Sequence, residues 1–212
     1  MPVDARAQFA TDYNVSRQKL AQFDRYIDCV IEAQARMNLV ARSTLPDIWT
    51  RHICDSAQLL DHGHAGSRWL DLGAGAGFPG IVLAILGAEV DMIESIGKKA
   101  AFLREVIYEL GLAQRARVFH GRIESLSPWP APTIVARALA PLHQLFDYAL
   151  KFAAVNTRWV LPKGARVENE LVEAGQKFAF NYRLVPSRTL PEGRIVIAHS
   201  VMRKGDDATR DC

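Results

Sequence analysis

Glycines gather in one short stretch of the chain, where they could hold a ligand. The residues from Trp69 to Ala84 read W-L-D-L-G-A-G-A-G-F-P-G-I-V-L-A, which is an apolar run, a burst of glycines and a second apolar run. Glycines let the backbone turn sharply and let a ligand approach without a Cβ in the way. The expected strand ends at Leu72 and the expected helix begins near Pro79, so the loop follows the carboxyl end of a strand. Open α/β sheets bind their ligands at that end.

Two classes of ligand fit this loop. From Gly75 the residues G-A-G-F-P-G satisfy the dinucleotide pattern G-x-G-x-x-G. From Asp71 they satisfy D-x-G-x-G-x-G, the loop that class I methyltransferases use for S-adenosylmethionine. Both classes place an acidic residue at the end of the next strand, about twenty residues on, to bind the ribose hydroxyls. Glu94 has that position, so the pattern indicates an adenosine-containing ligand and leaves its identity open.

Residues after the third and fourth expected strands favour S-adenosylmethionine. Ile123 and Glu124 follow the third strand, in a turn that could lie beside an adenine. Arg137 follows the fourth strand, where a cation can hold a carboxylate by paired hydrogen bonds, and S-adenosylmethionine has a carboxylate. The alternative for Arg137 is an ion pair with a neighbouring side chain.

The elements that must position these residues form an α/β domain. The 212 residues are enough for one such domain with a modest appendage. Helical spacing predicts a helix over 16–37 and a shorter one over 46–60. From residue 68 onward, apolar strands alternate with amphipathic helices, as in βαβ units with a parallel sheet. The extended runs 182–190 and 193–202 predict an antiparallel hairpin with a short P-E-G turn.

Charge and composition limit the classes of function. The chain is 49% hydrophobic and 23% charged, as is usual for a soluble globular protein. No run of eighteen residues lacks a charge and no apolar signal-peptide core follows the first Met, so we expect neither a membrane span nor a secretory leader. The net charge is +3, and residues 137–212 carry 12 Lys and Arg against 8 Asp and Glu. A basic C-terminal half permits a polyanionic partner such as nucleic acid.

The cysteines and histidines do not predict a metal site. Three cysteines at unrelated spacings argue against a disulfide framework and a metal cluster, and favour the reducing cytoplasm. The group His52, Cys54, His62 and His64 matches no common ligand spacing. We therefore expect no metal, and we expect His52 and Asp55 to order the segment over the cofactor site.

From about Leu20 to Arg203 the chain resembles the ribosomal RNA small subunit methyltransferase G family, also called glucose-inhibited division protein B. The resemblance rests on these elements in order: Asn38-Leu39-Val40, Arg51-His52-Ile53-Cys54-Asp55-Ser56, the loop Gly73 to Gly80, Glu94 to Leu103, Arg137-Ala138 and Pro162-Lys163-Gly164. Ala74 and Ala136 depart from the residues that this family usually has. The resemblance implies a Rossmann-like class I fold: an N-terminal helical extension over 1–62, a methyltransferase core over 63–204 and a solvated tail over 205–212.

The resemblance also implies a reaction, the transfer of a methyl group from S-adenosyl-L-methionine to N7 of guanine 527 in 16S rRNA. The acceptor is expected within the 30S subunit or its precursor. Together with the loop, the resemblance predicts a set of cofactor contacts, with Glu94 on the ribose: Gly73, Gly75, Phe78, Glu94, Ile123, Glu124 and Arg137.

The chemistry of guanine N7 agrees with what the sequence lacks. N7 has a free lone pair and no proton to lose, so neither a general base nor a covalent nucleophile is needed. The enzyme needs in-line positioning of N7 and the methyl group and exclusion of water. Accordingly the chain has neither the N/D-P-P-Y sequence of amino-methylating enzymes nor the Pro-Cys pair of cytosine-C5 enzymes. No catalytic residue is predicted.

Recognition of the RNA is expected to depend on an unstacked base and on phosphate contacts. The major groove of A-form RNA is too deep and narrow for side chains to reach N7, so the target base must lie in a loop or be splayed out. About four cations that each contact a phosphate predict a slope near −3 for log affinity against log salt. The candidates for this face are Lys163, Arg166, Arg188 and Arg194.

Two other functions stay open at this point. One is an oxidoreductase with a nicotinamide cofactor, which the G-x-G-x-x-G pattern permits. The other is an RNA-binding or assembly protein without activity. The sequence predicts neither an oligomeric state nor the side chains that hold the target guanine.

Overall fold

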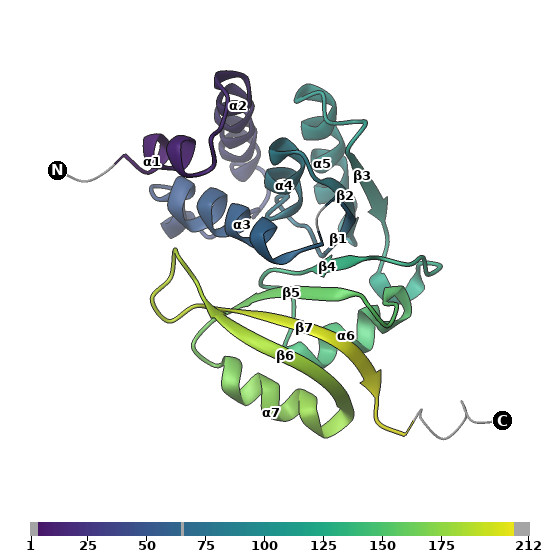
Figure 1. The fold of residues 1–212 in the computed structure, drawn as a ribbon. Helices are drawn as coiled ribbons and strands as arrows, with labels where there is room; N and C mark the ends of the chain where they lie inside the picture. The colour runs from purple at the N-terminus through teal and green to yellow at the C-terminus, as the bar shows by residue number, and fades with distance from the viewer. Residues whose placement is uncertain (1–3, 65, 206–212) are drawn as a thin grey trace.

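The fold is a central sheet covered by helices on both faces (Figure 1). The structure is a computed structural model, and it describes residues 4–64 and 66–205. Seven strands form one sheet in the order β3-β2-β1-β4-β5-β7-β6. The first five are parallel to one another, and β7 pairs antiparallel with both β5 and β6. This confirms the predicted α/β class with an antiparallel C-terminal hairpin.

The helices and strands have the following bounds. The helices are α1 (Ala5–Asp12), α2 (Arg17–Gln34), α3 (Asp55–Ala57), α4 (Gly80–Leu86), α5 (Gly97–Glu109), α6 (Leu142–Ala149) and α7 (Val167–Lys177). The strands are β1 (Arg68–Leu72), β2 (Glu89–Glu94), β3 (Ala116–His120), β4 (Thr133–Val135), β5 (Arg158–Lys163), β6 (Phe178–Pro186) and β7 (Arg194–Arg203).

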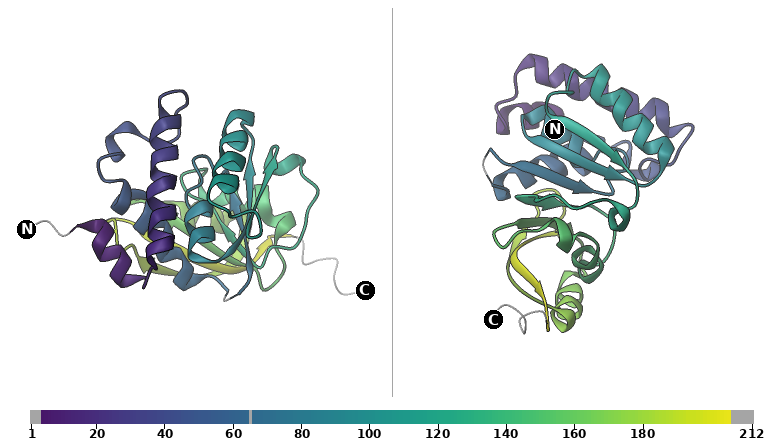
Figure 2. Two further views of the ribbon diagram at one scale, coloured as in Figure 1. Left: turned by 90° about the horizontal axis from the view of Figure 1, so that it is seen from above. Right: turned by 90° about the vertical axis from the view of Figure 1, so that its right-hand side faces the viewer.

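Alternating side chains of the strands divide the interior into two hydrophobic cores. Trp69, Val90 and Val135 point to one face and share a core with α1, α2, α4 and α5. Leu70 and Ile134 point to the other face, where α6 and α7 cover them. Figure 2 shows the two helical layers on opposite sides of the twisted sheet. The N-terminal helices therefore pack on the sheet itself, because their apolar side chains complete its first core.

The N-terminal segment agrees only in part with the prediction. The helix expected over 16–37 is α2, which Ser16 caps with its side-chain oxygen. The single helix expected over 46–60 is instead three short pieces: a π-helical turn over Trp49–Cys54, then α3, then a 3-10 turn over Gln58–His62. The π-helical turn widens the backbone and is often found at functional sites. Helix α1 was not predicted.

The C-terminal hairpin has a longer loop than predicted. Strand β6 ends at Pro186 and β7 begins at Arg194, so residues 187–193 form the loop in place of the short P-E-G turn. The hydroxyl of Ser187 accepts backbone N–H bonds from Thr189 and Leu190, which curls the chain away from strand pairing. Helix α7 was also missed by the prediction. Apart from Gly205, the tail predicted over 205–212 lies outside the described residues.

Candidate functional site

The glycine loop follows β1, the strand at which the strand order of the sheet reverses: β2 and β3 lie on one side of β1, and β4 and β5 lie on the other. Strand β1 pairs with β2 on one side and with β4 on the other, so the loops after β1 and β4 border a common crevice. Gly73 and Gly75 have φ values of 67° and 57°, in the left-handed region that disfavours residues with a Cβ. In the described part of the chain, a Cβ on Gly75 would meet only the Gly73 carbonyl oxygen, at 3.8 Å. The loop therefore exposes backbone to open space at Gly75.

Glu94 joins the glycine loop to the end of β2. Its Oε2 accepts a hydrogen bond from the Gly75 N–H at 2.8 Å, and its Oε1 accepts one from the Ile96 N–H at 2.7 Å. The Glu94 side chain is buried, and these two bonds fix its carboxylate. Each carboxylate oxygen has a second lone pair for a ligand hydroxyl. The structure thus brings two of the predicted cofactor residues, Gly75 and Glu94, into direct contact.

Asp71 lies under the same loop with one oxygen unpartnered. Its Oδ2 accepts a hydrogen bond from the Gly80 N–H at 2.9 Å, whereas its Oδ1 is buried without a partner among the described residues. Burial raises the pKa of Asp71 to about 7. A buried acceptor without a partner is costly in a folded protein and is usually satisfied by a water or an ion.

Ile123 and Glu124 form a 3-10 turn just past the end of β3. Ile123 is buried in the core of the second face and Glu124 is exposed. Strand β3 is a neighbour of β2, so this turn lies one strand beyond Glu94 along the carboxyl edge of the sheet. The predicted residues therefore follow that edge in the order of the strands.

Arg137, predicted to hold the cofactor carboxylate, is bound to the segment before the sheet. Its Nη2 lies 2.8 Å from His52 Nδ1, and its Nη1 donates to the Arg51 carbonyl oxygen at 3.1 Å. Nη1 also lies 3.4 Å from Asp55 Oδ2, and the guanidinium carbon lies 5.1 Å from the Phe78 ring centroid. These contacts use three of its five N–H donors. Two donors thus remain without a partner among the described residues.

His52 is held as a neutral ring. Its Nε2 lies 2.7 Å from Thr44 Oγ1, and its ring stacks on Phe78 with centroids 4.8 Å apart. Burial, with added effects of Arg137 and Arg51, lowers the pKa of His52 to about 3. Since Arg137 can only donate, His52 Nδ1 accepts and its Nε2–H donates to Thr44. Phe78, one of the predicted cofactor contacts, is buried in this stack.

Asp55 links Arg137 to the C-terminal hairpin. Its Oδ1 accepts from Thr189 Oγ1 at 2.6 Å and from Gln58 Nε2 at 3.0 Å. Gln58 in turn accepts a hydrogen bond from the Arg188 backbone N–H at 2.9 Å. The sequence analysis expected His52 and Asp55 to order the segment over the cofactor site. It missed Gln58 and Thr189, because Asp55 and Thr189 are 134 positions apart and no local pattern joins them.

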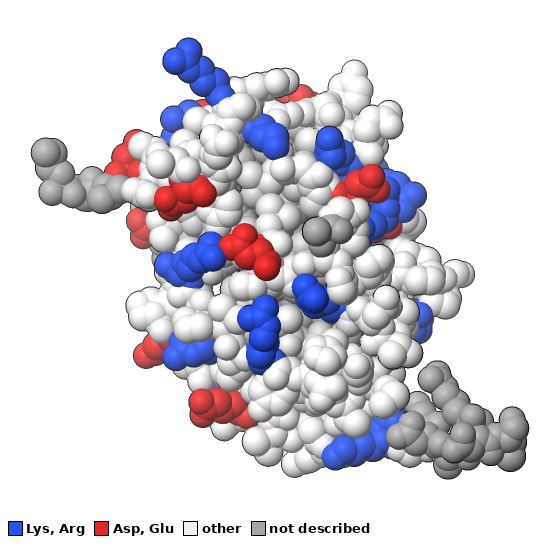
Figure 3. All heavy atoms as spheres, in the orientation of Figure 1, with Lys and Arg blue, Asp and Glu red and all other residues white. Residues whose placement is uncertain are grey.

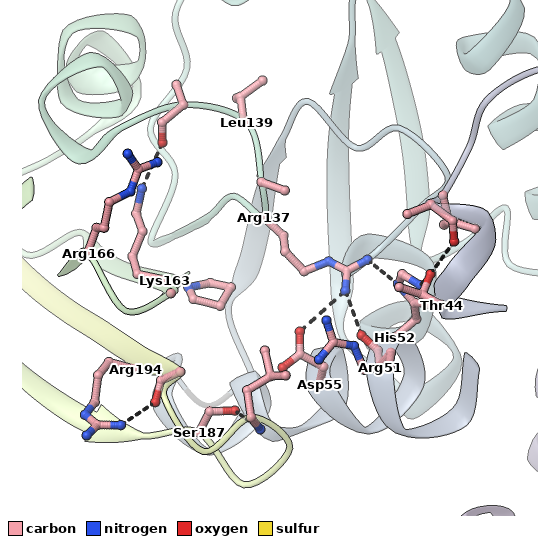
Figure 4. Close-up of a pocket in the computed structure, with 18 of the residues that line it drawn as sticks. Thr44, Arg51, His52, Asp55, Arg137, Leu139, Lys163, Arg166, Ser187 and Arg194 are labelled. Carbon is pink, nitrogen blue, oxygen red and sulfur yellow. Dashed lines mark hydrogen bonds and ion pairs between the residues drawn. The ribbon is translucent and has the colours of Figure 1, made fainter. Parts of the chain in front are cut away.

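A cavity of about 640 Å³ lies beside this cluster. Its volume is within the range of small-molecule sites, about 300–1,000 Å³. Figure 4 shows Arg137 reaching toward His52 and Asp55 on one side of the cavity, with Lys163 and Arg166 on the other. Leu139 lines the cavity and also packs on the glycine loop, since a Cβ on Gly73 would lie 2.7 Å from Leu139 Cδ1. The cavity and the glycine loop thus meet at Leu139.

The four predicted phosphate-binding cations are divided between two cavities. Lys163, Arg166 and Arg194 line the cavity, together with Arg51. Arg188 lines a second cavity, behind α1, and pairs with Asp61 at 2.7 Å. Arg188 thus lies at a different cavity from the other three cations, with its backbone N–H bound to Gln58.

Lys163 also differs from a surface cation. Its side chain is only 8% exposed, and its Nζ lies 2.8 Å from Glu170 Oε2. On the face drawn in Figure 3, basic and acidic side chains are scattered among uncharged ones and form no continuous basic surface. The cavity, with Arg51, Arg166 and Arg194 on its wall, is therefore the basic feature that the site offers to an anion.

Comparisons with other sequences identify the family. The sequence model described as rRNA small subunit methyltransferase G matches residues 19–190. The ribosomal RNA small subunit methyltransferase G of Hyphomonas neptunium is 43% identical over 205 residues, which are 96% of this chain and 98% of that protein. The protein of the same name from Bradyrhizobium diazoefficiens is 45% identical over 90% of this chain and 75% of that protein.

Comparisons with solved structures identify the fold. The cofactor-bound protein Rv0187 from MTB superposes with a TM-score of 0.62 at 16% identity, over 94% of this chain and 97% of that one. The O-methyltransferase from Bacillus cereus in complex with SAH has a TM-score of 0.56 at 17% identity, over 91% and 96%. The predicted Rossmann-like fold of class I methyltransferases is therefore confirmed.

Within residues 4–64 and 66–205, no helix combines the length and the apolarity that crossing a bilayer requires. In the same ranges, no three His, Cys, Asp or Glu side chains gather as metal ligands do.

The family match and the identity to these relatives show that the chain belongs to the rRNA small subunit methyltransferase G family.

Proposed function

We propose that this protein transfers a methyl group from S-adenosyl-L-methionine to N7 of guanine 527 in 16S rRNA. The observation that supports this most directly is the meeting of two sites at Leu139: a glycine loop held by Glu94 and a cavity lined by arginines. A methyl donor in the first and an acceptor base in the second would be neighbours. Family membership supports rRNA as the acceptor.

The residues at the glycine loop fit S-adenosylmethionine. The open space at Gly75 admits a ligand against the backbone, and Glu94 offers carboxylate oxygens to the ribose hydroxyls. Asp71 lies buried beneath the loop and accepts a hydrogen bond from the Gly80 N–H, which holds the start of α4 in place. The two remaining donors of Arg137 are suited to the cofactor carboxylate. The predicted contacts Gly73, Phe78, Ile123 and Glu124 complete the proposed site.

The bound cofactor supplies an activated methyl group, and the protein supplies position and exclusion of water. Guanine N7 attacks through its free lone pair, so no side chain has to remove a proton. His52, the titratable ring nearest to Arg137, is hydrogen-bonded at both nitrogens and acts as a support for that arginine. We therefore assign no general base.

The arginines of the cavity are the proposed contacts to the RNA backbone. Arg51 and Arg166 are exposed, Arg194 is half-buried, and all three line the cavity. A splayed-out nucleotide brings its own phosphates to the mouth of such a cavity. Guanidinium groups bind phosphate oxygens by paired hydrogen bonds. The RNA would then be held around its target base.

The test uses 30S particles and free 16S RNA from a strain that lacks this methylation. Each is incubated with the protein and S-adenosylmethionine, cleaved at 7-methylguanine with borohydride and aniline, and the break is mapped. A single new break at position 527 supports the cofactor, the atom and the target together, and the better of the two substrates identifies the RNA context.

A matched reaction with Glu94→Gln should lose the break, because the amide puts an N–H group beside the N–H of either Gly75 or Ile96. A break elsewhere in the RNA would overturn the position, and cofactor binding without any break would overturn the acceptor. Binding of NAD in place of S-adenosylmethionine would favour the oxidoreductase that the loop pattern permits.

A further inference from the structure

Lys163 and Glu170 form a fixed pair in the wall of the arginine-lined cavity. Lys163 is the last residue of β5 and Glu170 lies in α7, and their side chains are 8% and 22% exposed. Lys163 Nζ lies 2.8 Å from Glu170 Oε2 and donates to the Ala140 carbonyl oxygen at 2.8 Å. Glu170 Oε2 also accepts from the Leu142 N–H at 2.9 Å. Both charged groups are thus held in one orientation.

The pair has hydrogen-bonding capacity left over. An ammonium has three donors; Lys163 donates one hydrogen bond, to Ala140, and forms one ion pair, with Glu170, so at least one donor is left over. Glu170 Oε1 accepts no hydrogen bond from the residues that the structure describes, because all recorded contacts of this carboxylate go to Oε2. Both residues line the cavity. The wall therefore presents one donor and one strong acceptor next to each other.

This donor and acceptor match one edge of guanine. The Watson–Crick edge of guanine presents the O6 acceptor beside the N1–H and N2–H donors, whereas adenine presents an amino donor beside an N1 acceptor. We propose that Lys163 donates to O6 and that Glu170 accepts from N1–H and N2–H, so that the pair selects guanine as the acceptor base. This inference rests on the proposed function and names the residues that recognise the base.

Recognition through this edge is compatible with the reaction at N7. Arginine commonly reads guanine through O6 and N7, but such a contact would occupy the lone pair that must attack the methyl group. The Watson–Crick edge lies away from N7, so contacts there hold the base and leave N7 free. Flipped bases are commonly read on this edge. Arg51, Arg166 and Arg194 then remain for phosphates, and Lys163 moves from the predicted phosphate face to the base.

The experiment varies the acceptor base one group at a time. The target guanine is replaced by inosine, which lacks only the 2-amino group, or by adenosine, in 16S RNA joined by splinted ligation and placed in the context that wild-type protein methylates. We expect wild-type kcat/KM to fall roughly 10-fold with inosine, since one base contact of this kind is lost. Adenosine should be methylated far less, because both partners of the pair then face the wrong group.

Variants test whether the Lys163–Glu170 pair causes the preference for guanine over inosine. Glu170→Gln should reduce the guanine-to-inosine ratio toward 1, because a neutral amide replaces the carboxylate that distinguishes the two bases. Glu168→Gln is the matched control, since Glu168 lies on the same helix, is exposed and has no recorded partner in the described ranges. It should keep the wild-type ratio. Cofactor binding by calorimetry verifies that each variant is folded.

The outcomes separate this inference from the proposed function. Equal methylation of guanine and inosine by the wild-type protein overturns the inference whatever the variants do, and so does a wild-type ratio in Glu170→Gln. Absence of methylation on unmodified guanine RNA overturns the proposed function instead.

Discussion

At the scale of single residues, backbone conformation decides what can bind at the glycine loop. Gly75 has a left-handed φ, has open space where a Cβ would point, and donates its N–H to Glu94. Arg137 and Asp71 lie close to the same loop with hydrogen-bonding capacity unused, one as a donor and one as an acceptor. Adding an atom at Gly75 therefore changes ligand binding more than it changes the folded protein.

Replacement of Gly75 by Ala tests this point. The left-handed backbone costs a residue with a Cβ about 1–2 kcal/mol, and the new methyl group projects into the space that the ligand needs. We expect cofactor affinity to fall at least about 10-fold in calorimetry, a loss of about 1.4 kcal/mol of binding free energy. Gly111→Ala is the control, because Gly111 has a similar φ of 66° with no atom within 4 Å and lies at the end of α5. If both variants bind the cofactor like wild type, the loop is not the site.

At the scale of elements, the segment between α2 and β1 is attached to the sheet through polar contacts. His52 connects Thr44 to Arg137, and Asp55 connects Arg137 to Thr189 of the hairpin loop. Three separate parts of the chain thus meet at one guanidinium. The arrangement depends on a neutral His52, since a protonated ring would place its Nδ1–H against the Arg137 donors.

The pH dependence of stability follows from this requirement. Burial holds the pKa of His52 near 3, against 6.5 in an unfolded chain. Between these values the unfolded chain binds a proton that the folded protein does not, so the free energy of unfolding falls as the pH drops below 6.5. By pH 5 this effect amounts to roughly 1–2 kcal/mol. Urea unfolding at pH 7.5 and pH 5 should show a larger loss in wild type than in His52→Gln. Equal losses would contradict a buried neutral ring.

At the scale of the whole molecule, the net charge is small, but several of the basic side chains lie close together. The net charge is only +3, yet Arg51, Arg166 and Arg194 line one cavity while Arg188 pairs with Asp61 behind α1. Electrostatic contact with an RNA backbone is expected where these cations converge. The number of phosphates that the protein neutralises can be read from the salt dependence of binding.

Binding of target RNA should therefore respond to Arg166 and not to Arg188. Three phosphate contacts to a single strand predict a slope of about −2 for log affinity against log salt, and loss of one contact reduces its magnitude by about 0.7. We expect that reduction for Arg166→Gln and a wild-type slope for Arg188→Gln, measured by filter binding across salt concentrations. A slope near −3 that weakens equally in both variants would restore the four-cation face predicted from sequence.

The sequence by itself determined the features that depend on neighbours along the chain. The glycine loop, the acidic residue at the end of β2 and the antiparallel hairpin all follow from short patterns, because strand period and glycine placement are local properties. The predicted length of the hairpin loop was wrong, because hydrogen bonds to the Ser187 hydroxyl replace strand pairing there. Helix α7 was missed, although its apolar residues Val167, Leu171 and Ala174 follow a helical period.

Only the tertiary structure decided which charged groups meet. Arg137 bonds to residues 82–86 positions away, and Arg188 lies at a different cavity from Arg194 although six positions separate them. The sequence predicted Lys163 as a surface cation, whereas in the structure α7 places Glu170 next to its ammonium group. The direction of a long side chain depends on the packing of elements that are distant in sequence. Residue type and spacing therefore predicted the glycine loop, whereas the packing of β5, α7 and the hairpin formed the proposed acceptor site.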